Sequence, residues 1–170
     1  MDRHLWLVGM MGAGKSSVGA ALALRRGVPF YDTDDEVEAE AGCTIARLWM
    51  ERGEAAFRDL EAQAVARVAA APAGVVATGG GVVIDPSNVA AMRASGTVVW
   101  LTAPAAELYA RVGETADRPL LSGGDGGERL ADLLALRADR YREAADHTID
   151  TTGRTTGDVV DEIEARWTPS

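Results

Sequence analysis

The sequence predicts an α/β fold built on a parallel β-sheet. Short apolar runs alternate along its 170 residues with longer segments whose apolar residues recur at helical spacing. A glycine-rich loop, residues 9–16, also stands directly between the first apolar run and the first helical segment. Such alternation is typical of strands joined by right-handed helical crossovers. We expect one domain, over residues 1–170, because this length is enough to bury a sizeable core.

The first half of the chain predicts three strands. Leu5–Val8 is a continuous apolar run, as expected of a strand that is buried on both faces of a sheet. The helix expected after it, over 15–26, is ended by Gly27 and Pro29. A second strand is expected at 29–33, a helix at 36–41, a long helix with one apolar stripe at 54–71, and a third strand at 75–77. Residues 42–53 are short and mixed in character and predict no clear element.

The second half predicts two more strands between helices. Pro86 and Pro104 each suit the first turn of a helix, so helices are expected over 86–95 and 104–111. The strands are expected at 97–101 and 148–149, and the remaining helices at 128–145 and 156–166. Residues 112–127 are rich in glycine and polar groups, which predicts a mobile loop.

Composition and charge argue against several classes of protein. The chain has 26 acidic and 17 basic residues, a net charge of −9, and no basic run, so nucleic-acid binding is not expected. No apolar run reaches the roughly 20 residues of a membrane span. The run Leu5–Met11 is too short for a secretion signal with its cleavage site. A lone cysteine, Cys43, fits a reducing compartment, and we expect a cytoplasmic protein with no membrane partner.

A phosphate-binding loop is the most specific local motif. Gly9–Ser16 matches G-x-x-x-x-G-K-[ST] in full, between a predicted strand and a predicted helix. The glycines let successive N–H groups turn toward an anion, and the helix that follows adds its positive end. Lys15 can reach the β- and γ-phosphates, and the Ser16 hydroxyl can ligate Mg²⁺. Because Lys15 is the only lysine, the N-K-x-D motif usual in GTPases is absent, which favours ATP.

Charged side chains after the second strand and on the long helix form a candidate acceptor site. Asp32 and Asp34 follow a strand whose carboxyl end should face the ligand crevice, where they could hold Mg²⁺ and an acceptor hydroxyl. Capping of the next helix by Asp34 or Asp35 is the alternative. Arg58 and Glu61 share a helix face, which allows either an arginine fork held for an anionic substrate or a surface ion pair. The spacing alone does not decide between these two.

Two glycine-containing loops complete the set of candidate site residues. Gly79-Gly80-Gly81 follows the third strand and allows either the close approach of a ligand or a plain turn. Arg118 lies in the polar segment, where it could bring positive charge to a transferring phosphoryl group or remain a solvated charge.

Together these motifs resemble those of the shikimate kinases, small relatives of the nucleoside monophosphate kinases. The resemblance runs from Gly9 to Arg154 and rests on the phosphate loop together with Asp32-Thr33-Asp34, Phe57-Arg58-Asp59-Leu60-Glu61, Gly79-Gly80-Gly81 and Arg118-Pro119-Leu120-Leu121. It implies a three-layer P-loop fold with a five-stranded parallel sheet of order 2-3-1-4-5, a substrate-binding segment near 33–61 and a lid near 112–124. It also implies a monomeric enzyme that uses ATP and Mg²⁺ to phosphorylate the 3-hydroxyl of shikimate in aromatic amino-acid biosynthesis.

The resemblance further implies a role for each candidate residue. The catalytic residues would be Lys15, Asp34 and Arg118, with Asp34 holding the acceptor hydroxyl or serving as its base. Ser16 and, through water, Asp32 would hold Mg²⁺. ATP would be bound by Gly12, Ala13, Gly14, Lys15, Ser16, Ser17, Arg118 and the two residues that flank adenine, Arg111 and Arg154. Shikimate would be bound by Asp34, Gly80, Gly81, the wall residues Trp49 and Phe57, the carboxylate-binding Arg58 and Arg137, and Glu61, which would orient Arg58.

One departure and three alternatives accompany this interpretation. The third strand lacks the acidic residue of a Walker B motif at its end, so Asp32 would have to serve the metal. A gluconate kinase-like enzyme is the nearest alternative, and the Arg58–Glu61 pair with the triple glycine favours shikimate over it. A non-catalytic nucleotide-binding regulatory module would not need Lys15, Asp32, Asp34 and Arg118 together. A nucleoside monophosphate kinase would bring a phosphate-bearing acceptor beside two carboxylates, which is electrostatically unfavourable.

Overall fold

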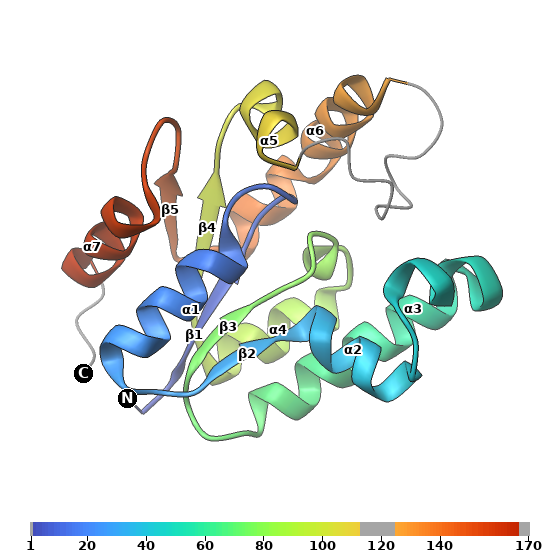
Figure 1. Cartoon of the computed structure of the whole chain (residues 1–170). Coiled ribbons are helices and arrows are strands. Elements are labelled where there is room, and N and C mark those ends of the chain that lie inside the picture. Colours follow the sequence, from blue (N-terminus) through green and yellow to red (C-terminus); the bar gives the residue numbers. More distant parts are fainter. Residues whose placement is uncertain (1, 113–124, 167–170) are drawn as a thin grey trace.

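Five parallel strands form one sheet between two layers of helices in the computed structural model, which describes residues 2–112 and 125–166 (Figure 1). The strands are β1 (His4–Val8), β2 (Phe30–Asp32), β3 (Val75–Ala77), β4 (Gly96–Thr102) and β5 (His147–Asp150). Their order across the sheet is β2-β3-β1-β4-β5, and every neighbouring pair is parallel. The predicted fold class and the implied strand order are therefore confirmed.

One or two helices follow each strand along the chain. They are α1 (Lys15–Arg26), α2 (Thr33–Ala41), α3 (Ile45–Ala69), the short 3₁₀ helix η1 (Val82–Ile84), α4 (Pro86–Ser95), α5 (Ala105–Val112), α6 (Gly126–Ala144) and α7 (Thr156–Arg166). Helix α6 begins two residues earlier than expected, because the Asp125 carboxylate caps it by accepting the Gly127 N–H at 2.9 Å. Within the described ranges, no helix is both long and apolar enough to cross a membrane.

Residues 42–53 differ from the sequence-based expectation, because most of them lie in α3. The Thr44 hydroxyl caps this helix by accepting the Arg47 N–H at 3.3 Å. The helix continues to Ala69, with a break at Gly53, whose φ of 79° and ψ of 174° are not helical. Leu48 is the fully buried residue of the stretch, so its sequence lacks the broad apolar stripe by which a helix is recognised.

Both faces of the sheet are covered by apolar side chains. Leu5 and Leu7 of β1 point into a core beneath α1, α5 and α7, whereas Trp6 and Val8 point into a second core beneath α3, α4 and α6. This alternation is the two-residue period of a strand, and burial on both sides explains the unbroken apolar run. A smaller third cluster, which includes Val37 and Leu48, joins α2 to α3.

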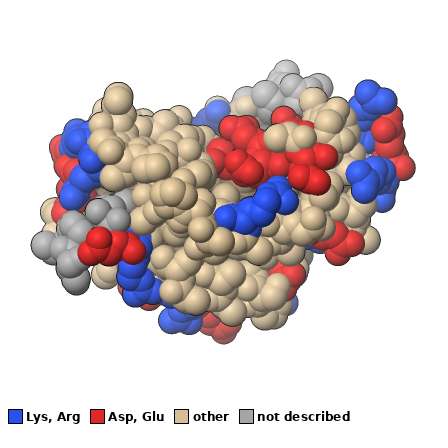
Figure 2. All heavy atoms as spheres, turned by 90° about the horizontal axis from the view of Figure 1, so that it is seen from below, with Lys and Arg blue, Asp and Glu red and all other residues tan. Residues whose placement is uncertain are grey.

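The surface charge is unevenly distributed. Figure 2 shows acidic side chains gathered into one band on the face seen from below, with basic side chains beside it. On the acidic helix α2, Glu36 and Glu40 lie 4.0 and 3.9 Å from the guanidinium of Arg67 in α3. The net charge of −9 therefore says little about the charge at any one site.

Candidate active site

A cavity of about 810 Å³ lies where β1, β2 and β3 end. These strands are neighbours in the order β2-β3-β1, so the loops at their carboxyl ends meet at one edge of the sheet. The cavity is lined by every predicted site residue that the structure describes: Gly12, Ala13, Gly14, Lys15, Ser16, Ser17, Asp32, Asp34, Trp49, Phe57, Arg58, Glu61, Gly80, Gly81, Arg111, Arg137 and Arg154. Arg118 and nearly all of the expected lid, from residue 113 to 124, fall outside the described residues.

The phosphate loop forms one end of this cavity. Gly12 and Gly14 have φ values of 81° and 89°, and the close approach of the Leu108 carbonyl oxygen leaves no room for a side chain at Gly12. Helix α1 starts at Lys15 without a side-chain cap, as suits an anion-binding helix end. The Lys15 ammonium folds back over the loop and donates to the carbonyls of Gly9 and Met10 at 2.8 and 3.0 Å.

Asp32 joins the phosphate loop to α2. Its Oδ2 accepts the Ser16 hydroxyl at 2.7 Å, and its Oδ1 accepts the Asp34 N–H at 3.0 Å. The cap of α2 is therefore Asp32, and the alternative that Asp34 or Asp35 caps this helix is wrong. Asp34 also lies in the first helical turn rather than on the strand, because β2 ends at Asp32, yet both carboxylates still line the cavity.

The pairing of Ser16 with Asp32 suits a magnesium ion. A hydroxyl and a carboxylate are hard oxygen donors, and they stand together beside the phosphate loop. The described residues contain no group of three acidic, histidine or cysteine side chains that could hold a metal unaided. Mg²⁺ commonly takes one or two protein oxygens and completes its shell with phosphate oxygens and water, so this donor set fits it.

The opposite end of the cavity holds a buried ion pair. Arg58 Nη1 donates to Glu61 Oε2 at 2.8 Å, and Arg58 also contacts Glu54 Oε1 at 3.3 Å. Glu61 is 1% exposed and the Arg58 side chain 19% exposed, which excludes the surface ion pair left open by the spacing. Burial raises the pKa of the Glu61 carboxyl, and the neighbouring Arg58 opposes that rise. Arg58 is thereby held with its charge facing the cavity.

The triple glycine packs against these charged groups. The Gly79 N–H donates to the Thr33 hydroxyl at 3.1 Å. A Cβ at Gly79 would lie 2.7 Å from Asp34 Oδ1, and one at Gly81 would lie 2.3 Å from Arg58 Nη1. Glycine is therefore needed for the close approach of charged side chains to the loop, and the loop is more than a plain turn.

Arg137 of α6 differs from the other arginines of its helix. It is 6% exposed and lines the cavity, whereas Arg140 and Arg142 are exposed. Its charge lowers the pKa of Glu61, although burial of Glu61 outweighs that effect. Trp49 and Phe57 form an aromatic wall nearby, with ring centroids 5.6 Å apart. The acceptor end thus combines the partly buried Arg58 and the buried Arg137 with an aromatic wall.

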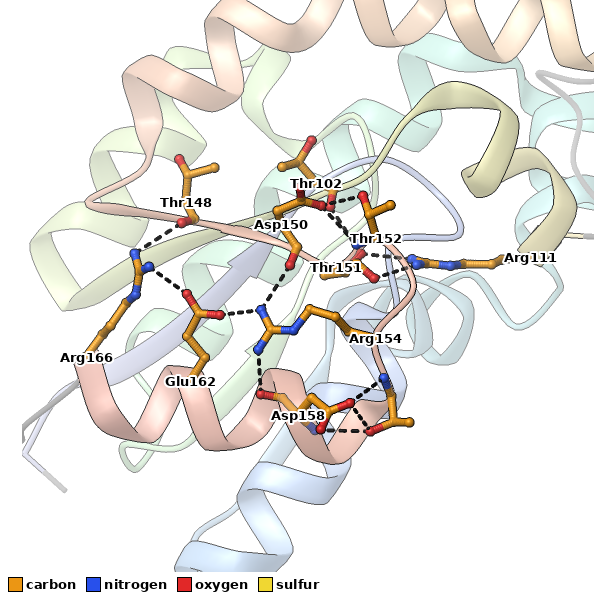
Figure 3. Close-up of polar contacts among 11 residues, drawn as sticks. Thr102, Arg111, Thr148, Asp150, Thr151, Thr152, Arg154, Asp158, Glu162 and Arg166 are labelled. Carbon is orange, nitrogen blue, oxygen red and sulfur yellow. Dashed lines mark hydrogen bonds and ion pairs between the residues drawn. The ribbon is translucent and has the colours of Figure 1, made fainter.

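The third part of the cavity is lined by Arg111 of α5 and by Thr151 and Arg154 of the loop that follows β5. Arg111 donates to the Thr151 hydroxyl and carbonyl at 2.9 and 2.7 Å, and it pairs with Glu107. Arg154 donates to the carbonyls of Asp150 and Asp158 at 3.0 and 2.8 Å, as Figure 3 shows. Both predicted adenine-flanking arginines line the cavity, and both also fix the backbone around it.

Sequence reasoning missed several residues that shape the site. Thr33 holds Gly79, Glu107 holds Arg111, and the Tyr141 hydroxyl donates to the Gly80 carbonyl. The position of Thr33 between two candidate carboxylates was a usable signal. Tyr141 and Gly80 are 61 residues apart, and no local pattern indicates that they meet.

Comparison with known proteins identifies one family. The family model described as shikimate kinase matches residues 11–168. A shikimate kinase of Symbiobacterium thermophilum is 49% identical over 162 residues, which cover 94% of this chain and 93% of that protein. The structure of the Acinetobacter baumannii shikimate kinase in complex with shikimate aligns with a TM-score of 0.92 and 36% identity, over 95% of this chain and 90% of that one. A gluconokinase of Sinorhizobium meliloti shares the fold alone, at 19% identity and a TM-score of 0.58, over 96% of this chain and 90% of that one.

Proposed function

Because the chain belongs to the shikimate kinase family, we propose that it transfers the γ-phosphoryl group of ATP to the 3-hydroxyl of shikimate, giving shikimate 3-phosphate and ADP. The observation that supports this best is that one cavity joins an anion-binding loop to the Arg58–Glu61 pair. A phosphate donor and an anionic acceptor bound at its two ends face each other. Phosphoryl transfer depends mainly on such positioning and on the neutralisation of charge.

The phosphate loop binds the donor in this proposal. The backbone N–H groups of residues 12–17 and the start of α1 bind the phosphates, and the Lys15 ammonium neutralises the β- and γ-phosphates. Arg111 and Arg154 flank the adenine in the third part of the cavity, which they line together with Thr151. Their contacts with the backbone around Thr151 and Asp158 favour this role, because they hold both side chains in place.

The acceptor is bound through its carboxylate. Arg58 presents a planar fork that matches a carboxylate, and Arg137 adds a second positive charge, which is buried. Glu61 orients Arg58, and the backbone of Gly80 and Gly81 adds contacts beside it. Trp49 and Phe57 wall the ring of the acceptor.

Asp34 acts on the acceptor hydroxyl. Its carboxylate lines the cavity between the phosphate loop and the Arg58–Glu61 pair, beside Gly79. It holds the hydroxyl and accepts its proton while the hydroxyl oxygen forms a bond to the γ-phosphorus and the bond from that phosphorus to the β–γ bridging oxygen breaks. Arg118 belongs to the motif Arg118-Pro119-Leu120-Leu121 of the expected lid, and its positive charge neutralises the transferring phosphoryl group.

Mg²⁺ is the metal that these donors suit. Ser16 and, through water, Asp32 would hold it next to the phosphate loop. When bound, it supplies neutralisation of the phosphate charge. The lack of an acidic residue at the end of β3 is consistent with Asp32 taking this role.

ADP release tests the proposal directly. The purified protein is given ATP and Mg²⁺ with shikimate, gluconate, AMP or no acceptor, and Lys15→Ala serves as the inactive control. We expect release that depends strictly on shikimate. Release with gluconate or AMP alone would overturn the acceptor assignment and keep the kinase fold. ATP binding by the folded protein without acceptor-dependent release would instead favour a non-catalytic module.

Three further properties belong to the same proposal. We expect the chain to act as one domain with a substrate-binding segment near 33–61, to be monomeric, and to work in the cytoplasm. Each is a prediction from the sequence and its family. Sedimentation of the purified protein and fractionation of its native cells would check the last two.

A further inference from the structure

The geometry points to Tyr141 as a positioning residue for acceptor binding. We infer that its hydroxyl fixes the Gly80–Gly81 peptide and the Arg137 side chain in the orientation that the acceptor needs. The inference rests on the proposed function and extends it to a residue outside the lining of the cavity. Tyr141 does not itself touch the cavity, so its effect must act through these neighbours.

Tyr141 is firmly held. It is 0% exposed, and its ring stacks on Trp100 of β4 with the centroids 5.7 Å apart and the planes 21° apart. The stack ties α6 to the centre of the sheet, because β4 pairs with both β1 and β5. A phenol ring that is packed in this way has little conformational freedom. Its hydroxyl can therefore hold the groups that it contacts in a fixed position.

The Tyr141 hydroxyl contacts the acceptor half of the cavity twice. It donates to the Gly80 carbonyl, and Arg137, one helical turn earlier on α6, lies against it. Burial raises the pKa of Tyr141 to about 12, with Arg137 opposing the rise, so the hydroxyl keeps its proton and remains a donor at neutral pH. One atom therefore supports both the glycine loop and a carboxylate-binding arginine.

Other hydrogen bonds hold the residues on either side of the Gly80 carbonyl, and the Gly81 carbonyl accepts the Ile84 N–H at 3.0 Å. Gly79 is held by the Thr33 hydroxyl at 3.1 Å, and its carbonyl accepts the Val82 N–H at 3.2 Å. At Gly80 the Tyr141 hydroxyl is the hydrogen-bond partner of the carbonyl. In a planar trans peptide the carbonyl and the next N–H point in opposite directions, so this bond also sets the direction of the Gly81 N–H. Among the described residues that N–H meets no acceptor, which leaves it for a ligand.

The substitution Tyr141→Phe removes this hydroxyl and keeps the stacked ring. Loss of the neutral hydrogen bond to the Gly80 carbonyl predicts a rise in the shikimate KM of at least about 2- to 12-fold, because the contact with Arg137 is lost as well. The KM for ATP and kcat should change less than twofold, because Tyr141 contacts neither the phosphate loop nor Asp34. A role confined to packing would instead lower the melting temperature and leave the shikimate KM in place.

Tyr31→Phe is the matched control. The Tyr31 hydroxyl also donates to a backbone carbonyl, that of Pro72 at 3.0 Å, but it lies on β2 away from the cavity lining. We would measure both KM values, kcat and the melting temperature of the wild type and both variants. Equilibrium binding of shikimate without nucleotide adds an independent readout of acceptor affinity.

The outcomes separate this inference from the proposed function. A selective rise in shikimate KM and Kd in Tyr141→Phe, absent from Tyr31→Phe, supports the positioning role. Equal values in the two variants, or a Tyr141→Phe protein that unfolds or loses ATP and shikimate affinity alike, would overturn it while the wild type still phosphorylates shikimate. A wild-type protein that does not phosphorylate shikimate would overturn both.

Discussion

The substitution Gly81→Ala tests how Arg58 is positioned. A Cβ at residue 81 would lie 2.3 and 2.6 Å from the Arg58 Nη atoms, whereas ordinary contact begins at 3.4 Å. The guanidinium must therefore move by about 1 Å, and we expect this shift to disrupt its 2.8 Å bond to Glu61. Backbone strain does not contribute, because the φ of −99° and ψ of 2° at Gly81 are open to other residues.

The expected decrease in kcat/KM can be estimated from the hydrogen bond to a charged group that is lost when Arg58 is displaced. A hydrogen bond to a charged group contributes about 1.5–3 kcal/mol, so displacement of Arg58 should lower kcat/KM for shikimate by roughly 10- to 150-fold. The KM for ATP should stay within twofold. Arg58→Ala sets the upper limit, since it removes the whole side chain. Steady-state kinetics with each substrate varied in turn measures both effects.

Gly157→Ala is the control for the glycine substitution itself. Gly157 is exposed in the first turn of α7, and its nearest contact for a new Cβ is the Thr155 hydroxyl at 3.7 Å. This variant should keep the wild-type shikimate KM. If Gly81→Ala also keeps kcat/KM for shikimate within threefold of the wild type, the position of Arg58 does not depend on the absence of a side chain at residue 81.

Three more substitutions probe other parts of the site. Asp34→Asn removes the proposed proton acceptor and should lower kcat by about 10²- to 10⁴-fold in steady-state assays while ATP binding is kept. Glu61→Gln changes how stability depends on pH. In the native protein the pKa of Glu61 is raised above its ordinary value of 4.5. Between pH 4.5 and the native pKa, the folded state therefore binds more protons than the unfolded state, and the free energy of unfolding of the wild type falls as pH rises. The variant lacks this group, so its stability should not show this fall. Urea unfolding from pH 4.5 to 8 measures this difference. Glu107→Gln weakens the acceptor that binds both Arg111 and the Gly153 N–H, so the KM for ATP should rise a few-fold without change in the shikimate KM.

Each of these three predictions has a contradicting result. Normal turnover in Asp34→Asn would remove Asp34 from the mechanism. A stability difference between Glu61→Gln and wild type that stays constant with pH would mean that the native pKa is not raised. An increase in the shikimate KM of Glu107→Gln as large as that for ATP would show that its contacts serve the whole cavity rather than its nucleotide end.

Much of the fold follows from local sequence patterns. The continuous run Leu5–Val8, the complete phosphate-loop motif and the prolines at the starts of helices fix the positions of β1, α1 and α4 closely. The helical character of residues 45–53 was missed, because one buried residue, Leu48, gives no periodic signal. Periodicity reports burial, so a helix that buries little is nearly invisible to it.

The sequence indicates which residues form the site. It does not indicate how deeply each side chain is buried or which groups it contacts. Spacing could not decide whether Arg58 and Glu61 form a surface pair or a buried one, since burial depends on what packs over them. The capping role of Asp32 depends on the exact residue at which β2 ends. Arg137 differs from Arg140 only in the face of α6 on which it lies. Such contacts arise from tertiary packing and not from neighbouring residues.

The identity of the product is the most direct test of the proposed phosphoryl transfer. The protein would be incubated with ATP, Mg²⁺ and shikimate, and the products analysed by mass spectrometry and by ³¹P and ¹H NMR. We predict stoichiometric ADP and a monophosphate ester whose phosphorus couples to the proton on carbon 3 of the ring. ADP without a phosphorylated shikimate, or a phosphate on another oxygen, would mean that the protein does not transfer the phosphoryl group to the 3-hydroxyl of shikimate.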